Sequence, residues 1–177
     1  MFYLCVKMYR MCYGDDLMKI KSGIGFDAHR FAAGRKLIIG GVEIEHELGL
    51  DGHSDADVLI HAIVDAVAGP ALGRDIGNLF PDTDKAYKDI DSKILLKKAV
   101  DEIRLAGYEI SNVDAQIIAQ KPKMAPHIPA MRKILADVMG LEFDDITIKA
   151  TTTEKMGFTG REEGIAALAS ALVFRRG

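Results

Sequence analysis

Tryptophan is absent from this chain of 177 residues, and aromatic side chains make up only 7% of it. No apolar run approaches the ~20 residues that a membrane-spanning helix needs, so we predict no membrane span. Cysteine is scarce: Cys5 and Cys12 are the only two, which disfavours a disulfide framework and favours a reducing, cytoplasmic location. Excess positive charge is also missing, because 23 basic residues stand against 26 acidic ones. Binding to nucleic acid is therefore disfavoured.

The remaining composition suits one compact domain, with 49% hydrophobic and 28% charged residues. Patterned sequence begins at Lys19, so we expect a single domain over residues 19–177. Residues 1–18 mix Met, Tyr, Cys and charges without a clear period. We expect them to form a poorly ordered N-terminal extension, and they do not fit a signal peptide.

Hydrophobic spacing predicts alternating strands and helices along this domain. The stretch from Ile20 alternates with period two, and the run Leu37 to Ile44 contains Gly40-Gly41, which suggests a bend within an extended segment. The segment 164–174 fits a strand or a helix. We expect strands near 20–29, 108–119 and 146–152, and helices over 58–68, 92–106 and 126–139.

Local signals suggest how these elements begin and end. Ser54 followed by Asp57 resembles a capping box, and Gly69-Pro70 should stop the helix that follows. The turn-rich stretch 73–91 is long for a connection in a small domain, and long loops often hold ligands. The economical fold class is α+β, an α/β sandwich in which helices pack on one face of a mixed sheet.

The strongest chemical signal is a group of histidines and aspartates between residues 27 and 65. Asp27 and His29 are two apart on a predicted strand, so their side chains leave the same face about 6.6–6.8 Å apart. His61 falls in mid-helix, with Asp57 and Asp65 one turn away on either side, and one of them could hold the second imidazole nitrogen. Two imidazoles and one carboxylate form a three-ligand set of the kind found in catalytic Zn²⁺ sites.

Other interpretations of these three residues stay open at this point. The same ligands could serve Fe²⁺ as in an oxygenase, or Mn²⁺ or Co²⁺. Alternatively, His61 is a partly buried helix histidine, and Asp27 and His29 merely end a strand. The glycines Gly23 and Gly25 before Asp27 favour a site, because they allow close approach to the backbone.

Three later segments could contact a phosphorylated or hydroxylated ligand. Asp75-Ile76-Gly77 and Phe80 to Asp84 offer carboxylates and backbone N–H groups, although turn chemistry alone explains them. Ala119 to Met124 carries two lysines around a proline and could be a solvated loop or an anion contact. Thr151 to Lys155, followed by Arg161, could position phosphate oxygens, with Glu154 on Mg²⁺, or could form a plain strand edge.

Taken in order, six segments resemble the 2-C-methyl-D-erythritol 2,4-cyclodiphosphate synthase family of the non-mevalonate isoprenoid pathway. The resemblance covers Ile20 to about Phe174. Each segment alone is weak, but six at compatible spacings are highly specific. They are Gly25 to Phe31, Gly52 to Asp57 with His61, Asp75 to Gly77, Phe80 to Asp84, Ala119 to Met124, and Ala150 to Arg161.

The resemblance implies a phosphorus–oxygen lyase that forms a homotrimer with active sites between subunits. The family's substrate is 4-diphosphocytidyl-2-C-methyl-D-erythritol 2-phosphate, and its products are the cyclic diphosphate and CMP. The substrate's own 2-phosphate attacks its β-phosphorus, so the enzyme need not supply a nucleophile. Two other functions remain in competition: a metal-dependent phosphohydrolase, and a non-catalytic trimer that binds cytidine nucleotides.

The resemblance also implies a role for each matching residue. Asp27, His29 and His61 match the ligands of Zn²⁺ or another divalent transition metal, and Glu154 matches a contact to a second ion, Mg²⁺ or Mn²⁺. His53 and Thr152 match catalytic positions. The remaining matches are to substrate-binding positions: Ser54, Asp75, Ile76, Gly77, Phe80, Pro81, Asp82, Thr83, Asp84, Ala119, Gln120, Lys121, Pro122, Lys123, Met124, Ala125, Thr151, Thr153, Phe158 and Arg161.

Two positions depart from the family pattern. Arg74 precedes Asp75 and Glu162 follows Arg161, where the family usually has glycine. If either position requires a positive φ, the local turn must differ.

Overall fold

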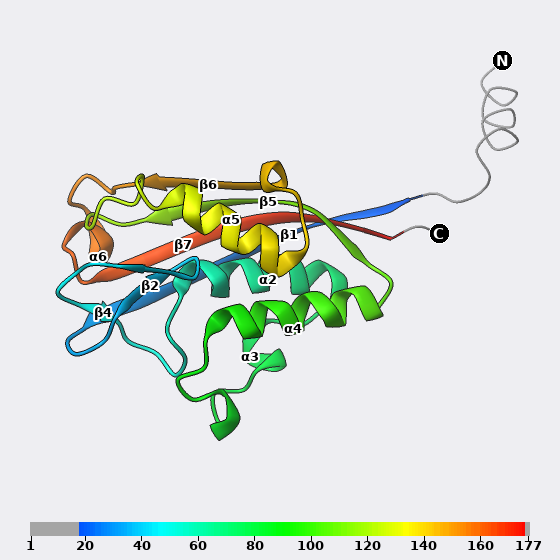
Figure 1. Ribbon diagram of the computed structural model, residues 1–177, viewed down its shortest axis with the longest axis horizontal. Coiled ribbons are helices and arrows are strands. Elements are labelled where there is room, and N and C mark those ends of the chain that lie inside the picture. The colour runs from blue at the N-terminus through cyan, green and yellow to red at the C-terminus, as the bar shows by residue number, and fades with distance from the viewer. Residues whose placement is uncertain (1–17, 176–177) are drawn as a thin grey trace, which may run out of the picture.

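A five-stranded mixed sheet forms the framework of the protein, seen in a computed structural model that describes residues 18–175 (Figure 1). The predictions for residues 1–17, including both cysteines, lie outside this range. Strand β7 is antiparallel to both of its neighbours, whereas β5 and β6 are parallel. The strand order is β4 (Gly49–Leu50), β1 (Lys19–Ala32), β7 (Gly164–Arg175), β5 (Glu109–Ile118) and β6 (Ile146–Thr151).

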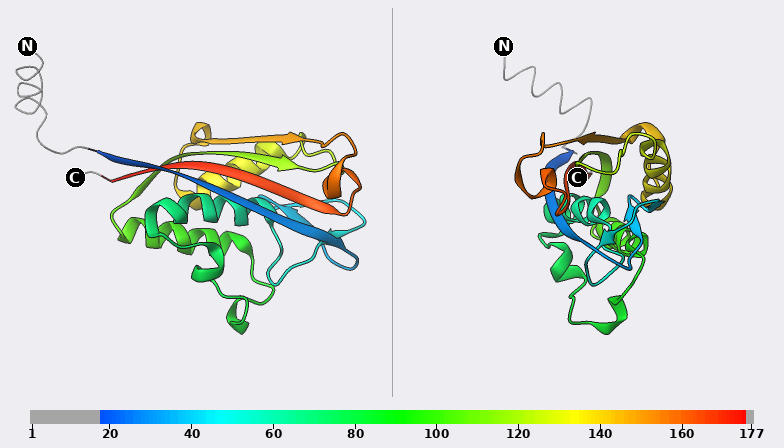
Figure 2. Two further views of the ribbon diagram at one scale, coloured as in Figure 1. Left: turned by 180° about the vertical axis from the view of Figure 1, so that it is seen from behind. Right: turned by 90° about the vertical axis from the view of Figure 1, so that its left-hand side faces the viewer.

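Three long helices form the second layer. Helix α2 (Val58–Leu72) packs along β1 and β7, while α5 (Ile128–Met139) packs on β6, and α4 (Ser92–Leu105) lies against α2 and α5 (Figure 2). The predicted α+β sandwich with helices on one face is therefore confirmed for the described residues. Short helical turns complete the fold: α3 (Ile76–Leu79), η1 (Lys85–Tyr87), η2 (Phe143–Asp145) and α6 (Gly157–Gly160).

Helix α2 lies unusually close to β1 because the strand presents glycine to it. A Cβ at Gly23 would be 2.0 Å from the carbonyl oxygen of Ala66, and one at Gly25 would be 2.0 Å from that of Ala62. Side chains at i, i+2 and i+4 share a strand face, so Asp27 faces the same helix as both glycines. The glycines thus bring the polar end of β1 up to α2.

The predicted end of this helix at Ala68 is wrong, because α2 continues through Pro70 to Leu72. Proline cannot donate to the carbonyl of Ala66, and that carbonyl instead lies against Gly23. The carbonyl of Pro70 accepts a hydrogen bond from Lys21 Nζ at 2.6 Å. Gly73 ends the helix in the left-handed conformation, with φ 69°.

The segment that fitted both a helix and a strand is β7, the central strand of the sheet. Its residues pair with β1 on one side and β5 on the other, as in Asp27 with Ala167 and Ala115 with Ala169. The bend at Gly40-Gly41 is confirmed as the turn between β2 (Leu37–Ile39) and β3 (Val42–Ile44), where both glycines have positive φ. The other predicted helices and strands agree within about two residues at each end, apart from β1, which ends three residues later than predicted, at Ala32.

None of the three long helices α2, α4 and α5 covers the opposite face of the sheet (Figure 2). Its apolar side chains come from the two neighbouring strands β1 and β7. Phe26 is 57% exposed and pairs in register with Leu168, which is 38% exposed. We call this surface the open apolar face; its residues are Ile20, Ile24, Phe26, Leu168 and Leu172.

Candidate metal centre and ligand cavity

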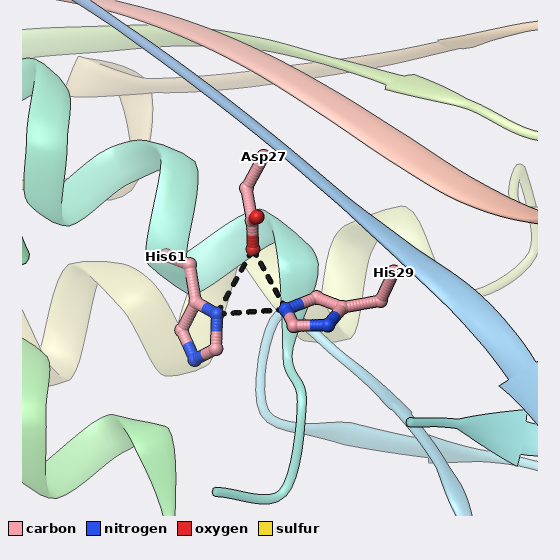
Figure 3. Close-up of side chains that lie close together, drawn as sticks. All are labelled: Asp27, His29 and His61. Carbon is pink, nitrogen blue, oxygen red and sulfur yellow. Dashed lines mark hydrogen bonds and ion pairs between the residues drawn. The ribbon is translucent and has the colours of Figure 1, made fainter. Parts of the chain in front are cut away.

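Asp27, His29 and His61 converge on one point between β1 and α2 (Figure 3). Asp27 Oδ2 lies 2.9 Å from both His29 Nε2 and His61 Nδ1. The two imidazole nitrogens are 3.1 Å apart. Within the described residues this is the one group of three side chains placed to share a metal ion, as the sequence predicted.

Asp27 and His29 each favour the charged form of the other. Burial by itself would raise the pKa of Asp27, but hydrogen bonds and charge from His29 and His61 hold it well below its usual range. Burial would lower the pKa of His29, yet the Asp27 carboxylate beside it raises that pKa above its usual value. His29 Nδ1 donates to the backbone oxygen of Asp51 at 2.7 Å, which turns Nε2 toward Asp27.

The donor set fits a divalent transition metal. Imidazole is a borderline ligand and carboxylate is a hard one, and this mixed set suits Zn²⁺, Fe²⁺, Mn²⁺ and Co²⁺. Ligands ~2.0–2.1 Å from a tetrahedral ion would lie ~3.3 Å from one another. The observed separations of 2.9 Å and 3.1 Å between the three donor atoms are close to this geometry. Three protein ligands leave a fourth position for a substrate oxygen.

The second nitrogen of His61 contacts hydroxyls, and the expectation that Asp57 or Asp65 would hold it is wrong. Nε2 lies 3.1 Å from Ser54 Oγ and 3.1 Å from Ser92 Oγ, the latter at the start of α4. Asp65 instead accepts a hydrogen bond from the backbone of Ile76 at 2.7 Å. Sequence reasoning missed Ser92 because it lies on a different helix, where spacing rules say nothing.

Asp57 anchors the start of α2 instead. Its carboxylate is fully buried and accepts hydrogen bonds from the backbone N–H groups of Gly40, Gly41 and Ile60 at 2.6–3.0 Å. Burial raises the pKa of this carboxyl to about 6, against the effect of these hydrogen bonds. The predicted capping box is therefore wrong: Asp57 is the N-cap, and Ser54 Oγ accepts from Ala56 N.

The loop carrying His53 and Ser54 is also held by hydrogen bonds from Arg35. Arg35 donates to the backbone oxygen of Gly52 at 3.0 Å and also to that of Ser54. These contacts were not predicted, since an arginine between strands carries no distinctive sequence signal. They place the loop beside the candidate metal ligands.

A cavity of about 600 Å³ opens beside His29 and His61. The predicted residues that line it are His53, Ser54, Ile76, Gly77, Phe80, Pro81, Asp82 and Thr83. Tyr87 and Leu95 line it too and were not predicted; Tyr87 packs edge-on against Phe80, with ring centroids 5.4 Å apart. Asp75 and Asp84 do not line it, and Asp75 caps α3 by accepting from Asn78 N at 2.8 Å.

The other predicted site residues gather in a second cluster at the ends of β5 and β6. Ala119 N donates to the oxygen of Thr151 at 3.0 Å, and Lys155 N donates to Gln120 Oε1 at 3.2 Å. Thr152 Oγ1 donates to Glu154 Oε1 at 2.8 Å. None of the described residues of this cluster lines the cavity beside His29 and His61. Its members are Ala119 to Ala125, Thr151 to Glu154, Phe158 and Arg161.

Strained backbone conformations occur in this second cluster, at Glu154, and directly beside it. Glu154 and Lys155 have φ of 51° and 64°, in the left-handed region that few side chains adopt. Of the two departures from the family pattern, Glu162 has φ 60°, whereas Arg74 has no positive φ. Glu162 thus takes a conformation that glycine adopts more easily. Its carboxylate pairs with Lys121 Nζ at 3.2 Å.

The fold and the site define a class: an α/β sandwich with a candidate divalent-metal centre beside a ligand cavity. The model of the YgbB family matches residues 20–174, and the chain belongs to this family. It is 61% identical over 158 residues to a 2-C-methyl-D-erythritol 2,4-cyclodiphosphate synthase from Bacteroides fragilis, covering 89% of this chain and 99% of that protein.

Solved structures agree with this assignment. The fold matches the bifunctional IspDF from Campylobacter jejuni with a TM-score of 0.86 and 44% identity, over 90% of this chain but only 43% of that longer one. It also matches IspF from Plasmodium falciparum in a CDP complex, with a TM-score of 0.77 and 33% identity, over 89% of this chain and 97% of that one. No helix within residues 18–175 is long and apolar enough to cross a membrane.

Proposed function

We propose that this protein is a 2-C-methyl-D-erythritol 2,4-cyclodiphosphate synthase, a lyase of non-mevalonate isoprenoid synthesis. It converts 4-diphosphocytidyl-2-C-methyl-D-erythritol 2-phosphate to the cyclic diphosphate and CMP. The observation that carries this proposal is the convergence of Asp27, His29 and His61 beside a cavity lined by other family-matched residues. A cytoplasmic location stays a prediction from the sequence.

The reaction needs positioning and charge neutralisation more than a protein nucleophile. An oxygen of the 2-phosphate forms a bond to the β-phosphorus, and the bond to the oxygen shared with the α-phosphorus breaks, releasing CMP. When bound, Zn²⁺ supplies Lewis acidity to a phosphate oxygen. His53 and Ser54, on the loop fastened by Arg35, would hold the 2-phosphate in line for attack.

The second cluster would bind the diphosphate and the base. Thr152 and Glu154 are joined by a hydrogen bond and are both accessible, so they could orient phosphate oxygens and a second ion such as Mg²⁺ or Mn²⁺. The segment Ala119 to Ala125 would take the cytosine, with Thr151, Thr153, Phe158 and Arg161 as further contacts. Asp75, Ile76 and Gly77 would contact the ribose, and Phe80 to Asp84 the erythritol.

We further propose a homotrimer in which the two groups of site residues come from different subunits. In one chain the second cluster does not line the cavity beside the metal ligands, so a complete site needs a second copy. The open apolar face offers a surface for that association, since exposed apolar side chains gathered on a sheet face favour burial.

Phosphorus NMR tests the proposed activity. The protein with Zn²⁺ and Mg²⁺ should convert the substrate to CMP and a species with two coupled cyclic-diphosphate resonances, and a chelator should stop this. The His61→Ala variant should lose this turnover and remain folded, whereas His127→Ala, which removes a histidine outside the site, should keep it. Free phosphate as the product would indicate a hydrolase, and tight binding of CDP without turnover by the folded protein would indicate a non-catalytic binding trimer.

A further inference from the structure

Behind His61 lies a chain of polar contacts that ends in a carboxylate. Ser92 Oγ is 3.1 Å from His61 Nε2, and the same hydroxyl donates to Asp55 Oδ1. The second oxygen of that carboxylate accepts from the backbone N–H of Ser92 at 3.0 Å. Ser92 is fully buried, so water does not compete for its hydroxyl.

These contacts determine which way the Ser92 hydroxyl points. A serine hydroxyl has one hydrogen and two acceptor lone pairs, and an ionised carboxylate can only accept. The hydrogen therefore goes to Asp55, and a lone pair faces His61. Two lone pairs would repel one another 3.1 Å apart, so Nε2 is favoured as the nitrogen that carries the proton. In the metal-free protein the Nδ1 of His61 lies within hydrogen-bond distance of Asp27 Oδ2, at 2.9 Å. With a metal ion held by Asp27 and His61 the imidazole keeps one hydrogen, and the Ser92 lone pair favours that hydrogen on Nε2, so Nδ1 would offer its lone pair to the ion.

We propose that Ser92 and Asp55 are positioning residues that hold His61 in the orientation and tautomer required for metal binding. This inference rests on the proposed metal site, and it goes beyond the residues matched to the family. Ser54 Oγ is equally close to Nε2, but its hydrogen is not directed elsewhere by a carboxylate. Ser54 can accept from Nε2 or donate to it, so it does not select a tautomer.

Zinc affinity, measured by competition with a chromogenic chelator, tests the proposed role of Ser92 and Asp55. Ser92→Ala should weaken Zn²⁺ binding by roughly 10–100-fold, the usual effect of losing such an outer partner. Asp55→Asn should also weaken it, because an amide can donate to Ser92 and turn the hydroxyl hydrogen toward Nε2. Ser54→Ala should change affinity less than either. If Ser54→Ala weakened Zn²⁺ binding as much as Ser92→Ala, the positioning role could not be assigned to Ser92.

A matched control separates this role from helix capping. Asp91 is the N-cap of α4 and accepts from Lys93 N at 2.9 Å, and it makes no hydrogen bond with His61. Asp91→Ala should lower the melting temperature without changing Zn²⁺ affinity. If Asp55 serves only to stabilise the helix, Asp55→Asn will resemble Asp91→Ala, and the proposal is wrong.

Proton NMR of the zinc-loaded protein gives a readout that does not depend on turnover. The Nε2–H of His61 should give a downfield resonance that exchanges slowly with water in the wild type. In Ser92→Ala it should move upfield and exchange faster. An unchanged resonance would refute the proposed role of Ser92. Because no substrate is present, this result is independent of whether the enzyme is a cyclodiphosphate synthase.

Discussion

Gly25 on β1 and Ala62 on α2 meet with no room for a side chain between them. A Cβ at Gly25 would be 2.0 Å from the Ala62 carbonyl oxygen and 2.8 Å from Ala66 N. The candidate metal ligands Asp27 and His61 lie on these same two elements, so this contact sets the distance between them. The packing of a glycine thus has a direct consequence for the chemistry.

We predict that Gly25→Ala destabilises the protein by about 3 kcal/mol or more and weakens Zn²⁺ binding, because strand and helix must separate. The matched control is Gly69→Ala on α2, the helix that Gly25 contacts, where nothing lies within 4 Å of the added Cβ. That change should stabilise the fold by about 0.5–1 kcal/mol, since alanine favours helix over glycine. Urea denaturation and zinc competition measure both effects, and equal destabilisation by the two variants would contradict the role of close packing.

The sequence predicts the convergence of Asp27, His29 and His61, because a local rule and a family resemblance both apply to these residues. Asp27 and His29 share a strand face by the two-residue period, and the motifs around His61 resemble those of one family. The partners of His61 could not be predicted in the same way. Helical spacing pointed to Asp57 and Asp65, but Ser92 is brought there by the packing of α4 on α2.

Two errors in the predicted fold also have tertiary causes. Pro70 cannot donate to the Ala66 carbonyl, yet α2 continues through it, and that carbonyl oxygen packs against Gly23, a strand residue 43 positions earlier in the sequence. The segment 164–174 was ambiguous because its alanines suit a helix, whereas pairing on both sides makes it the central strand. Neither the contact of α2 with Gly23 nor the pairing of β7 on both sides can be predicted from local sequence.

The open apolar face yields a prediction about assembly. Phe26→Glu should place a charge in the proposed subunit interface and convert the proposed trimer to monomers, because burying an unpaired charge is costly. The control is Leu105→Glu at the end of α4, where the leucine is already 88% exposed. Sedimentation of both variants measures the change, and a Phe26→Glu protein that keeps the wild-type mass would show that this face is not the interface.

The buried carboxylate of Asp57 should be important for stability. Asp57→Ala leaves the N–H groups of Gly40, Gly41 and Ile60 without their acceptor, so we expect a loss of about 3 kcal/mol or more. Asp91→Ala, which removes a single partly exposed N-cap contact, should cost only about 1 kcal/mol. Thermal and urea unfolding compare the two, and similar losses would show that the Asp57 network contributes no more than an ordinary cap.

Asp57 should also make stability depend on pH, with a sign opposite to that of a salt-bridged aspartate. Burial raises its pKa from 3.8 to about 6, so the folded protein binds more protons there than the unfolded chain between these values. Its contribution to stability therefore declines as pH rises through that window. Asp57→Asn should remove this component, so the stability of the variant relative to wild type should increase from pH 4 to pH 6.

Metal binding should also depend on pH, through His29. Asp27 raises the pKa of His29 above 6.5 in the metal-free protein, yet the imidazole must be neutral to bind a metal. Binding must therefore release a proton, and Zn²⁺ affinity should fall about tenfold for each pH unit below that pKa. Asp27 adds no dependence in this range, since its own pKa is held low. Calorimetry in buffers of different ionisation enthalpy counts the released protons, and an affinity that is constant from pH 5 to pH 8 would be inconsistent with His29 as a ligand.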